Sequence, residues 1–403
     1  MEQIAVLGYG VVGSGAVEVL DRNSDRIARN AGQEIRVKYI LDVRDFPGSP
    51  YENLLVKDFE TIVNDPEIAV VVEVIGGVGA ALEFTRRSLS AGKSVVTSNK
   101  ELVAAHGCEL LKLAGENGVN YLFEASVGGG IPIIRPVAQC IAANIINEIY
   151  GVLNGTTNYI LTEMGKNGAA FSTALEDAQR KGYAESDPSS DIDGHDACRK
   201  ICILSSLAFG RHVYPDHVST EGIRDVTVDD MRFAAEMGYK IKLLGRARTV
   251  GDKIAVYVAP HLISNDNLLA GVDGVMNGIV VRGNAVGDLM FYGAGAGKLP
   301  TASAVAADVI DAVKHINARK LISWDEGGLD ALTDPAQLES AWYIRTNAPR
   351  EKIAREFGSV SFTGGGGGAV TGFRTAVMNG KKIKELLERG IPALSLFRVL
   401  GDY

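Results

Sequence analysis

The stretch IAVLGYGVVGSGAVEVL, residues 4–20, decides the fold class of this 403-residue chain. A short aliphatic run leads into Gly8, Gly10 and Gly13, spaced G-x-G-x-x-G, and then into apolar residues at helical spacing. Glycines let such a turn bend tightly and approach a pyrophosphate, whose charge the first N–H groups of the helix attract. Between a strand and a helix the motif predicts a dinucleotide site rather than a bare tight turn. Its expected cofactor contacts are Gly8, Gly10, Val11, Val12 and Gly13.

The strand–helix alternation continues beyond this turn. Further β-branched runs start near residues 35, 69, 93 and 119, and helical patterns ending near glycine or asparagine separate them. Such alternation is typical of a parallel sheet with helices on both faces. The sequence therefore predicts an α/β fold whose first domain, residues 1–145, is a Rossmann-type doubly wound sheet completed by a helix at 301–320.

The end of the second predicted strand bears on cofactor preference. Leu41 is followed by Asp42 and then by Arg44. An acidic residue at this position accepts a hydrogen bond from the ribose hydroxyl of NAD, whereas a basic residue accommodates the 2′-phosphate of NADP. Both are present, so NAD and NADP stay open, and solvated loop charges are the alternative for each residue.

The sequence pattern changes after residue 145. Runs such as YKIKLLGRARTV at 239–250 and GIVVRGNAV at 278–286 predict a second, mixed sheet, which helices at 157–166, 171–181 and 193–209 interrupt. We predict a mixed α+β domain over residues 146–300. A linker precedes a last module at 338–403, which holds two strand–helix pairs around GGGGG at 364–368.

Composition narrows the class of protein. A net charge of −8 with interspersed signs argues against nucleic acid as a partner, and no run reaches the roughly 20 apolar residues that span a bilayer. A strand pattern begins at once, without a secretory leader. The cysteines form no C-x-x-C pair and are expected to be reduced and buried, as in a cytoplasmic protein. They are Cys108, Cys140, Cys198 and Cys202.

A second motif is GYAESDPSSDIDGHDACRK at 182–200. A calcium loop is excluded, because Ser189 and Lys200 would occupy its first and twelfth positions, where carboxylates are needed. Proline and glycine predict a loop that becomes helical near Asp193, so that Asp196 and Lys200 share a helix face as an i,i+4 pair. The alternative is an exposed ion pair of little energy. His195 is taken as a packing or loop residue, and no histidine spacing indicates zinc.

Several blocks in one order resemble the homoserine dehydrogenases over residues 1 to about 320. They are the glycine turn, EVIGG at 73–77, GKSVVTSNKELVA at 92–104, EASVGGGIPII at 124–134, LNGTTNYI at 153–160, the stretch 178–200 and GAGAGKLPTASAV at 293–305. The resemblance implies reversible oxidation of homoserine to aspartate semialdehyde by NAD or NADP, a step toward threonine and methionine. It also implies a homodimer or larger homo-oligomer, formed through the second sheet.

The resemblance also implies roles for individual residues. Lys200 would move the proton of the substrate hydroxyl, and Lys100 would hold and polarise the oxygen. Two ammonium groups at one pocket would lower each other's pKa, which a base requires. The implied substrate-binding residues are Glu185, Asp191, Asp196, Gly155 and Thr156, and further cofactor contacts are Arg44, Gly76, Ser98, Lys100 and Gly297.

The segment EASVGGGIPI resembles the family's monovalent-cation site. The implied ligands of a sodium ion are the Glu124 carboxylate and the main-chain carbonyls of Val127, Gly129 and Ile131. Oxygen ligands suit a hard cation. The alternative is a strand-to-helix turn with Pro132 at the helix start.

The last segment loosely resembles a shortened ACT module, a βαββαβ unit that senses threonine in many family members. Because GGGGG stands where the central hairpin would be, we expect weak or absent threonine inhibition. Two other functions remain open: another nicotinamide-dependent oxidoreductase of a small amino acid or amino aldehyde, and a regulatory protein that senses NAD(P) without chemistry. The second need not keep both Lys100 and Lys200.

Overall fold

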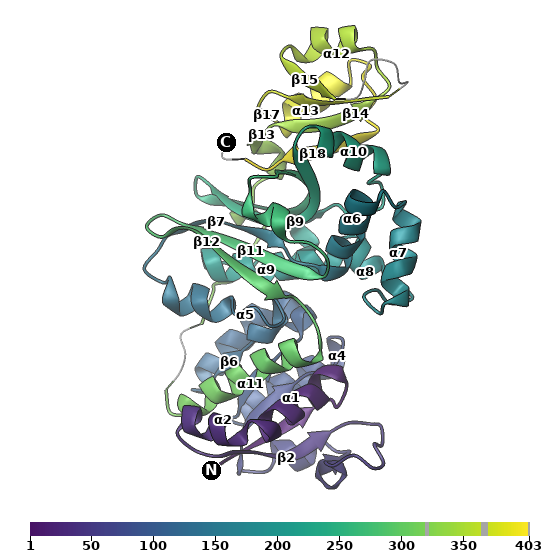
Figure 1. Ribbon diagram of the computed structural model, residues 1–403. Coiled ribbons are helices and arrows are strands. Elements are labelled where there is room, and N and C mark those ends of the chain that lie inside the picture. Colours follow the sequence, from purple (N-terminus) through teal and green to yellow (C-terminus); the bar gives the residue numbers. More distant parts are fainter. Residues whose placement is uncertain (319–321, 364–369, 402–403) are drawn as a thin grey trace. The chain divides into compact units, whose positions relative to one another are not determined.

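A computed structural model describes residues 1–318, 322–363 and 370–401, which form two compact units (Figure 1). The first unit comprises Met1–Ile145, Cys202–Pro215 and Gly293–Gly328. The second comprises Ile146–Ile201, Asp216–Tyr292 and the chain from Leu329 onward. Among the described residues, no helix combines the length and apolar character needed to cross a membrane.

The first unit is built on a six-stranded sheet in the order β3-β2-β1-β4-β5-β6, with every pair parallel. The aliphatic residues 4–7, 70–72 and 95–96 of its central strands are fully buried, as expected for a sheet covered on both faces. This confirms the predicted Rossmann-like sheet. The strands are β1 (Glu2–Leu7), β2 (Ile35–Leu41), β3 (Leu55–Val56), β4 (Ile68–Glu73), β5 (Ser94–Thr97) and β6 (Tyr121–Leu122).

Helices pack around this sheet. Figure 1 shows the returning helix α11 (Lys298–Lys314) beside α1 (Val11–Arg22). The two approach so closely that a Cβ on Gly15 would lie 2.9 Å from the Lys298 Cγ. The predicted helix 301–320 thus begins at Lys298 and ends at Lys314, and residues 319–320 lie outside the described part. The other helices are α2 (Ser24–Ala31), α3 (Glu60–Val63), α4 (Gly79–Ser90) and α5 (Lys100–Glu116).

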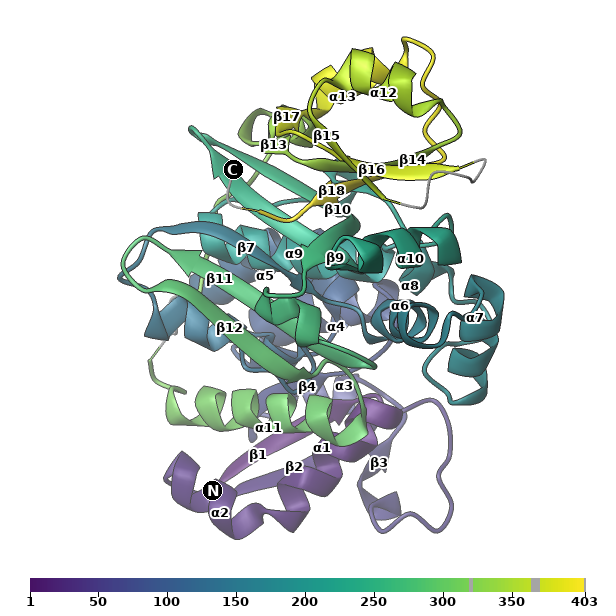
Figure 2. The ribbon, with the colours of Figure 1, turned by 45° about the horizontal axis from the view of Figure 1, so that its top comes forward.

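The second unit is built on a ten-stranded mixed sheet (Figure 2). Its main path runs β12-β11-β7-β9-β10-β18-β14-β16-β15, and β8 (Ser219–Thr220) pairs with β10. This confirms a separate mixed sheet. The path strands are β7 (Ile146–Val152), β9 (Tyr239–Val250), β10 (Lys253–Ser264), β11 (Met276–Gly283), β12 (Gly287–Ala294), β14 (Trp342–Thr346), β15 (Val360–Thr363), β16 (Thr371–Thr375) and β18 (Ser395–Val399). Its helices are α6 (Gly155–Asn167), α7 (Phe171–Arg180), α8 (Ser189–Ile192), α10 (Val228–Glu236), α12 (Arg350–Phe357) and α13 (Gly380–Leu387). Helix α9 (His195–Phe209) belongs to this unit as far as Ile201 and to the first unit from Cys202 onward.

The C-terminal strands extend this sheet. β18 pairs in parallel with β10 and antiparallel with β14, and a two-stranded ribbon of β13 (Glu339–Ser340) and β17 (Met378–Asn379) lies beside them. The expectation that GGGGG replaces a central hairpin is wrong, since β15 and β16 pair antiparallel on either side of that run. The run itself lies outside the described residues. Short strands of threonine, valine and phenylalanine form a hairpin that the glycines obscure in the sequence.

The four cysteines carry no disulfide. Cys198 and Cys202 are buried in α9, as predicted, and Cys108 in α5 is half-buried. Cys140 is exposed, contrary to expectation, because its segment forms a π-helical turn (Pro136–Cys140) that does not bury its last residue.

Candidate active site

The turn from β1 into α1 has the geometry that its glycines require. Gly8 has a φ of +96°, which side chains disfavour, and a Cβ on Gly13 would lie 1.9 Å from the Gly8 carbonyl oxygen. Gly10 caps α1, so Val11 and Val12 present the first free N–H groups of the helix. The turn lies beside the point where the strand order reverses, between β1 and β4, which is where such sheets bind ligands.

Two neighbouring strands bring further expected contacts to the same edge. Gly76 follows β4, Ser98 follows β5, and Lys100 is the first residue of α5. Asn99 joins these segments: its Oδ1 accepts a hydrogen bond from Leu102 N at 3.1 Å, and its Nδ2 donates to the carbonyl of Gly77 at 2.7 Å. The structure therefore places Gly76, Ser98 and Lys100 at the carboxyl edge of the sheet.

Glu73, which ends β4, is a buried carboxyl to which the sequence assigned no role. It accepts hydrogen bonds from Thr97 Oγ1 at 2.6 Å and from Ile75 N at 2.7 Å. Thr97 Oγ1 in turn accepts from Asn99 N at 2.9 Å. These hydrogen bonds from Glu73 through Thr97 position Asn99, which caps α5. The sequence feature that could have indicated Glu73 is an acidic residue at the end of the aliphatic run IAVVVE.

Burial raises the pKa of Glu73 to about 7, from an ordinary 4.5. The stability that a neutral Glu73 contributes is fully present below pH 4.5 and is lost as pH rises through 7, because the folded state binds its proton more tightly. Between pH 5 and 8.5 we expect the parent to lose about 2.5 kcal/mol of unfolding free energy relative to Glu73→Gln. Melting curves at the two pH values check this, and equal pH dependence of parent and variant would contradict it. Glu83→Gln, an exposed acid on α4, is the control.

Asp42 and Arg44 are engaged with each other. Asp42 is buried, and it accepts hydrogen bonds from Tyr9 N at 2.8 Å and from Arg44 Nε and Nη2 at 3.0 Å each. These Arg44 bonds hold the Asp42 pKa well below its usual range. The Arg44 side chain stays 60% exposed, and its Nη2 lies 3.9 Å from the Cβ position of Gly10. The acid is thus occupied within the protein, while the cation lies beside the glycine turn.

The loop before α11 contacts another glycine-rich loop. A Cβ on Gly129 would lie 2.5 Å from the Gly295 carbonyl carbon, and one on Gly130 would lie 2.9 Å from Pro300 Cβ. Gly297 caps α11 with a φ of +122°. The structure thus brings together two motifs, 124–134 and 293–305, that lie far apart in the sequence.

Glu124 is used as a buried anchor for the main chain. Its Oε1 accepts from the N–H groups of Ile133 and Ile134 at 2.6 and 2.8 Å, and its Oε2 accepts from Arg135 N at 2.9 Å. Asp308 on α11 accepts from Glu124 N at 2.8 Å. The carbonyl oxygens of Val127, Gly129 and Ile131 accept no hydrogen bond from the residues that the structure describes.

In the second unit, Asp196 and Lys200 form the predicted i,i+4 pair on α9. Lys200 Nζ donates to Asp196 Oδ2 at 2.7 Å and to the carbonyl of Leu153 at 2.8 Å. The alternative of an exposed pair is wrong, since Asp196 is 3% and Lys200 8% exposed. The helical turn α8 was not expected, and Gly194, with a φ of +86°, separates it from α9. His195 is exposed at the start of α9.

Asn154 joins two carboxylates, and sequence reasoning did not single it out. Its Nδ2 donates to Asp191 Oδ1 at 2.7 Å and to Asp196 Oδ2 at 2.8 Å. Its Oδ1 accepts from Thr157 N at 2.8 Å, which makes Asn154 the N-cap of α6. Burial, and then the neighbouring Asp196, raise the pKa of Asp191. The sequence feature that could have indicated Asn154 is an asparagine directly before a helix, which is a preferred N-cap residue.

The remaining expected substrate residues lie near this cluster in the chain. A Cβ on Gly155 would lie 2.8 Å from the Val275 carbonyl oxygen, so only glycine fits. Thr156 Oγ1 donates to the carbonyl of Tyr183 at 2.7 Å. Glu185 is exposed, and among the described residues its carboxylate has no hydrogen-bond or ion-pair partner. The structure therefore groups Gly155, Thr156, Asp191, Asp196 and Lys200, but not Glu185.

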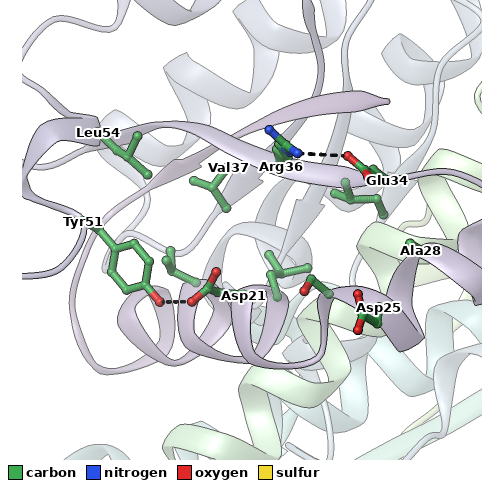
Figure 3. Close-up of a pocket in the computed structure, with 12 residues that line it drawn as sticks. Asp21, Asp25, Ala28, Glu34, Arg36, Val37, Tyr51 and Leu54 are labelled. Carbon is green, nitrogen blue, oxygen red and sulfur yellow. Dashed lines mark hydrogen bonds and ion pairs between the residues drawn. The ribbon is translucent and has the colours of Figure 1, made fainter.

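A groove of about 490 Å³ lies elsewhere in the first unit, between α1, α2 and β2 (Figure 3). Tyr51 donates to Asp21 Oδ2 at 2.9 Å on one side, and Arg36 pairs with Glu34 at 3.1 Å on the other. These last two residues lie at the amino end of β2, whereas nucleotides bind at the carboxyl ends of such strands. This groove is therefore separate from the dinucleotide turn.

Comparisons with known proteins agree with this geometry. The family described as "Homoserine dehydrogenase, NAD binding domain" matches residues 8–124, and "Homoserine dehydrogenase" matches residues 132–310. The homoserine dehydrogenase of Pseudomonas aeruginosa is 43% identical over 354 residues, which cover 86% of this chain and 82% of that protein. That of Synechocystis is 45% identical over 324 residues, covering 78% and 74%.

Solved structures extend the similarity. A homoserine dehydrogenase from Thiobacillus denitrificans matches with a TM-score of 0.89 at 38% identity, covering 99% of this chain and 98% of that one. A hyperthermophilic archaeal homoserine dehydrogenase in complex with NADPH matches with a TM-score of 0.65 at 30% identity, covering 77% and 98%. The chain belongs to the homoserine dehydrogenases, oxidoreductases that act on the CH–OH group of homoserine.

Proposed function

We propose that the chain interconverts L-homoserine and L-aspartate 4-semialdehyde with NADP, using Lys200 and Lys100 on the substrate oxygen. The observation that carries the proposal is the buried group of Asp191, Asp196 and Lys200 around Asn154. The test is absorbance at 340 nm with homoserine and, separately, NADP and NAD. Absence of homoserine-dependent reduction of either cofactor would refute the proposal.

The second unit supplies the proton chemistry. Lys200 accepts the hydroxyl proton in its neutral form, while Asp196 Oδ2 and the Leu153 carbonyl orient the amine. Asp191 offers a carboxylate within the same group, and we assign it, with Gly155 and Thr156, to positioning the substrate. Glu185, exposed on the preceding loop, is assigned to the substrate ammonium.

The first unit holds the nicotinamide cofactor, which supplies the hydride acceptor. Only glycine fits the tight turn at Gly8 and Gly13, and this turn directs the first N–H groups of α1 at the place where a pyrophosphate would bind. Gly76, Ser98 and Gly297 are assigned to further cofactor contacts. Lys100, at the carboxyl edge of β5, is assigned to holding and polarising the substrate oxygen.

The state of Asp42 and Arg44 favours NADP over NAD. NAD selection needs a carboxylate free to accept from the ribose hydroxyls, but the Asp42 carboxylate already accepts from Tyr9 and Arg44. The Arg44 guanidinium, by contrast, is 60% exposed and lies beside Gly10 of the turn. An exposed guanidinium beside the turn suits a 2′-phosphate.

Arg44→Ala should raise the KM for NADP about tenfold, because one exposed charge-assisted contact to the 2′-phosphate is lost. The KM for NAD should stay the same or fall, because Asp42 is released from Arg44 and can accept from the ribose hydroxyls. The measurement is initial rates at 340 nm with each cofactor. Arg36→Ala, which removes an exposed, ion-paired arginine from the same β2–β3 region, is the control. An equal rise for both cofactors would contradict the assignment.

We also propose a sodium site at the loop 127–131. It is supported by three main-chain carbonyls that accept no hydrogen bond from the described residues, since hard cations bind oxygen. Glu124 already accepts three N–H bonds, so its carboxylate would contribute charge more than a dedicated ligand atom. The ion would be structural, holding the turn.

The C-terminal segment supports an ACT-like module. Its elements run β14-α12-β15-β16-α13-β18, and its strand order is β18-β14-β16-β15, as in a ferredoxin-like βαββαβ unit. With the hairpin present, the glycine run no longer argues against threonine sensing, and the expectation of weak inhibition rests on the shortness of the segment alone. We further propose a homodimer or larger homo-oligomer through β12, which forms an edge of the sheet and leaves Tyr292 55% exposed.

A further inference from the structure

A cavity of about 220 Å³ lies in the second unit beside the C-terminal strands. Figure 2 shows β10, β18 and β14 side by side, with α13 beside them. The cavity joins these elements, because each contributes part of its wall. Side chains that bear on its chemistry are Glu221, Tyr257, Trp342, Ile383, Lys384 and Arg398.

Arg398 is the unusual member of this wall. It is 9% exposed, and its Nη2 donates to the Pro335 carbonyl at 2.9 Å. Its Nη1 is buried without a hydrogen-bond partner among the residues that the structure describes. None of these residues forms an ion pair with it either. A buried cation without an ion pair is rare, because the desolvation cost is large.

Two aromatic rings compensate Arg398 only in part. Its Cζ lies 4.2 Å from the Trp342 ring centroid and 5.1 Å from that of Tyr257. Such contacts attract a cation but bring no net negative charge. Burial accordingly lowers the pKa of Arg398. The carboxylates of Glu221 and Asp334 attract Arg398 without an ion pair, so an anionic ligand in direct contact with the guanidinium would supply an ion pair that these residues do not make.

The other walls define the kind of anion. Trp342, Ile383 and Leu396 offer apolar surface, which a hydrated inorganic ion does not use. Glu221 and Asp334 also line the cavity and would repel a doubly charged phosphate, while Lys384 adds a second cation. Among anions, a single carboxylate on a short hydrocarbon chain meets less repulsion from the two acids than a phosphate and can use the apolar wall.

We propose that this cavity binds a small organic monocarboxylate, whose carboxylate pairs with the Arg398 guanidinium and whose hydrocarbon part contacts Trp342 and Ile383. The bound molecule touches β10, β14, α13 and β18 at once. It therefore fastens the C-terminal segment to the sheet of the second unit and stabilises the folded protein.

The test is the melting temperature of the full-length protein with propionate as probe, at constant ionic strength set with chloride. Near saturation, propionate should raise the melting temperature by about 2–4 °C. Propanol, which has the same size but no charge, and phosphate should not. Equal shifts from propanol or from phosphate would overturn the proposal.

Two variants assign the effect to this cavity. Arg398→Met should abolish the propionate shift, and it should fold, because it removes an unpaired buried charge and keeps much of the volume. Lys384→Ala should reduce the shift, whereas Lys382→Ala, on the same helix and paired with Glu385, should not. A shift that persists in Arg398→Met would overturn the proposal. If Arg398→Met does not fold, equal propionate-induced shifts of the melting temperature in Lys384→Ala and Lys382→Ala would overturn the proposal.

Discussion

Lys200→Arg should lower kcat for homoserine oxidation by about 10²- to 10⁴-fold, which is the usual contribution of a general base. Arginine keeps the positive charge and can still pair with Asp196, but it does not lose its proton at any working pH. Alanine at this position would remove the ion pair of a buried aspartate and cost stability as well as activity. The arginine variant therefore separates the proton-transfer role from the structural one.

The measurement is kcat at saturating homoserine and NADP, with a melting curve to confirm that the variant is folded. Lys253→Arg, at the start of β10, is the matched control and should keep parental turnover. In the parent, oxidation should accelerate toward alkaline pH, because a lysine base must first lose its proton. Near-parental turnover in Lys200→Arg, or a flat parental profile from pH 7 to 10, would remove Lys200 from the proton step.

Asn154→Ala should lower kcat/KM for homoserine by about 10- to 100-fold. Its amide donates to Asp191 and to Asp196, and each bond to a charged group contributes about 1.5–3 kcal/mol. Without these donors the two carboxylates repel each other, and the pKa of Asp191, already raised, should rise further. The geometry of Asp196, and hence of Lys200, would relax.

This prediction has a matched control in Asn379, which caps α13 as Asn154 caps α6. Both alanine variants lose a helix cap, which costs about 1 kcal/mol. Only Asn154→Ala should lose catalytic efficiency, as measured by initial rates at varied homoserine. Equal kcat/KM in the two variants would show that Asn154 acts through stability alone.

Local patterns determined much of this protein in advance. The glycine turn and the strand–helix alternation predicted the parallel sheet, because both features are written in neighbouring residues. The pairing of Asp196 with Lys200 followed from helix geometry, which brings positions four apart onto one face. The strands of the second sheet were likewise visible as β-branched runs.

Tertiary structure decided which partners these residues meet and how deeply they are buried. Asn154 donates hydrogen bonds to carboxylates 37 and 42 positions away in the sequence. Glu73 accepts one from Thr97 on the neighbouring strand. Arg398 lies against Trp342 and Tyr257 from separate strands. Periodicity records which face of an element is apolar, but long-range packing fixes distances between elements. For that reason the sequence alone predicted the two sheets and the helix face that Asp196 and Lys200 share. The tertiary structure determined which charged groups are buried and which residues contact them.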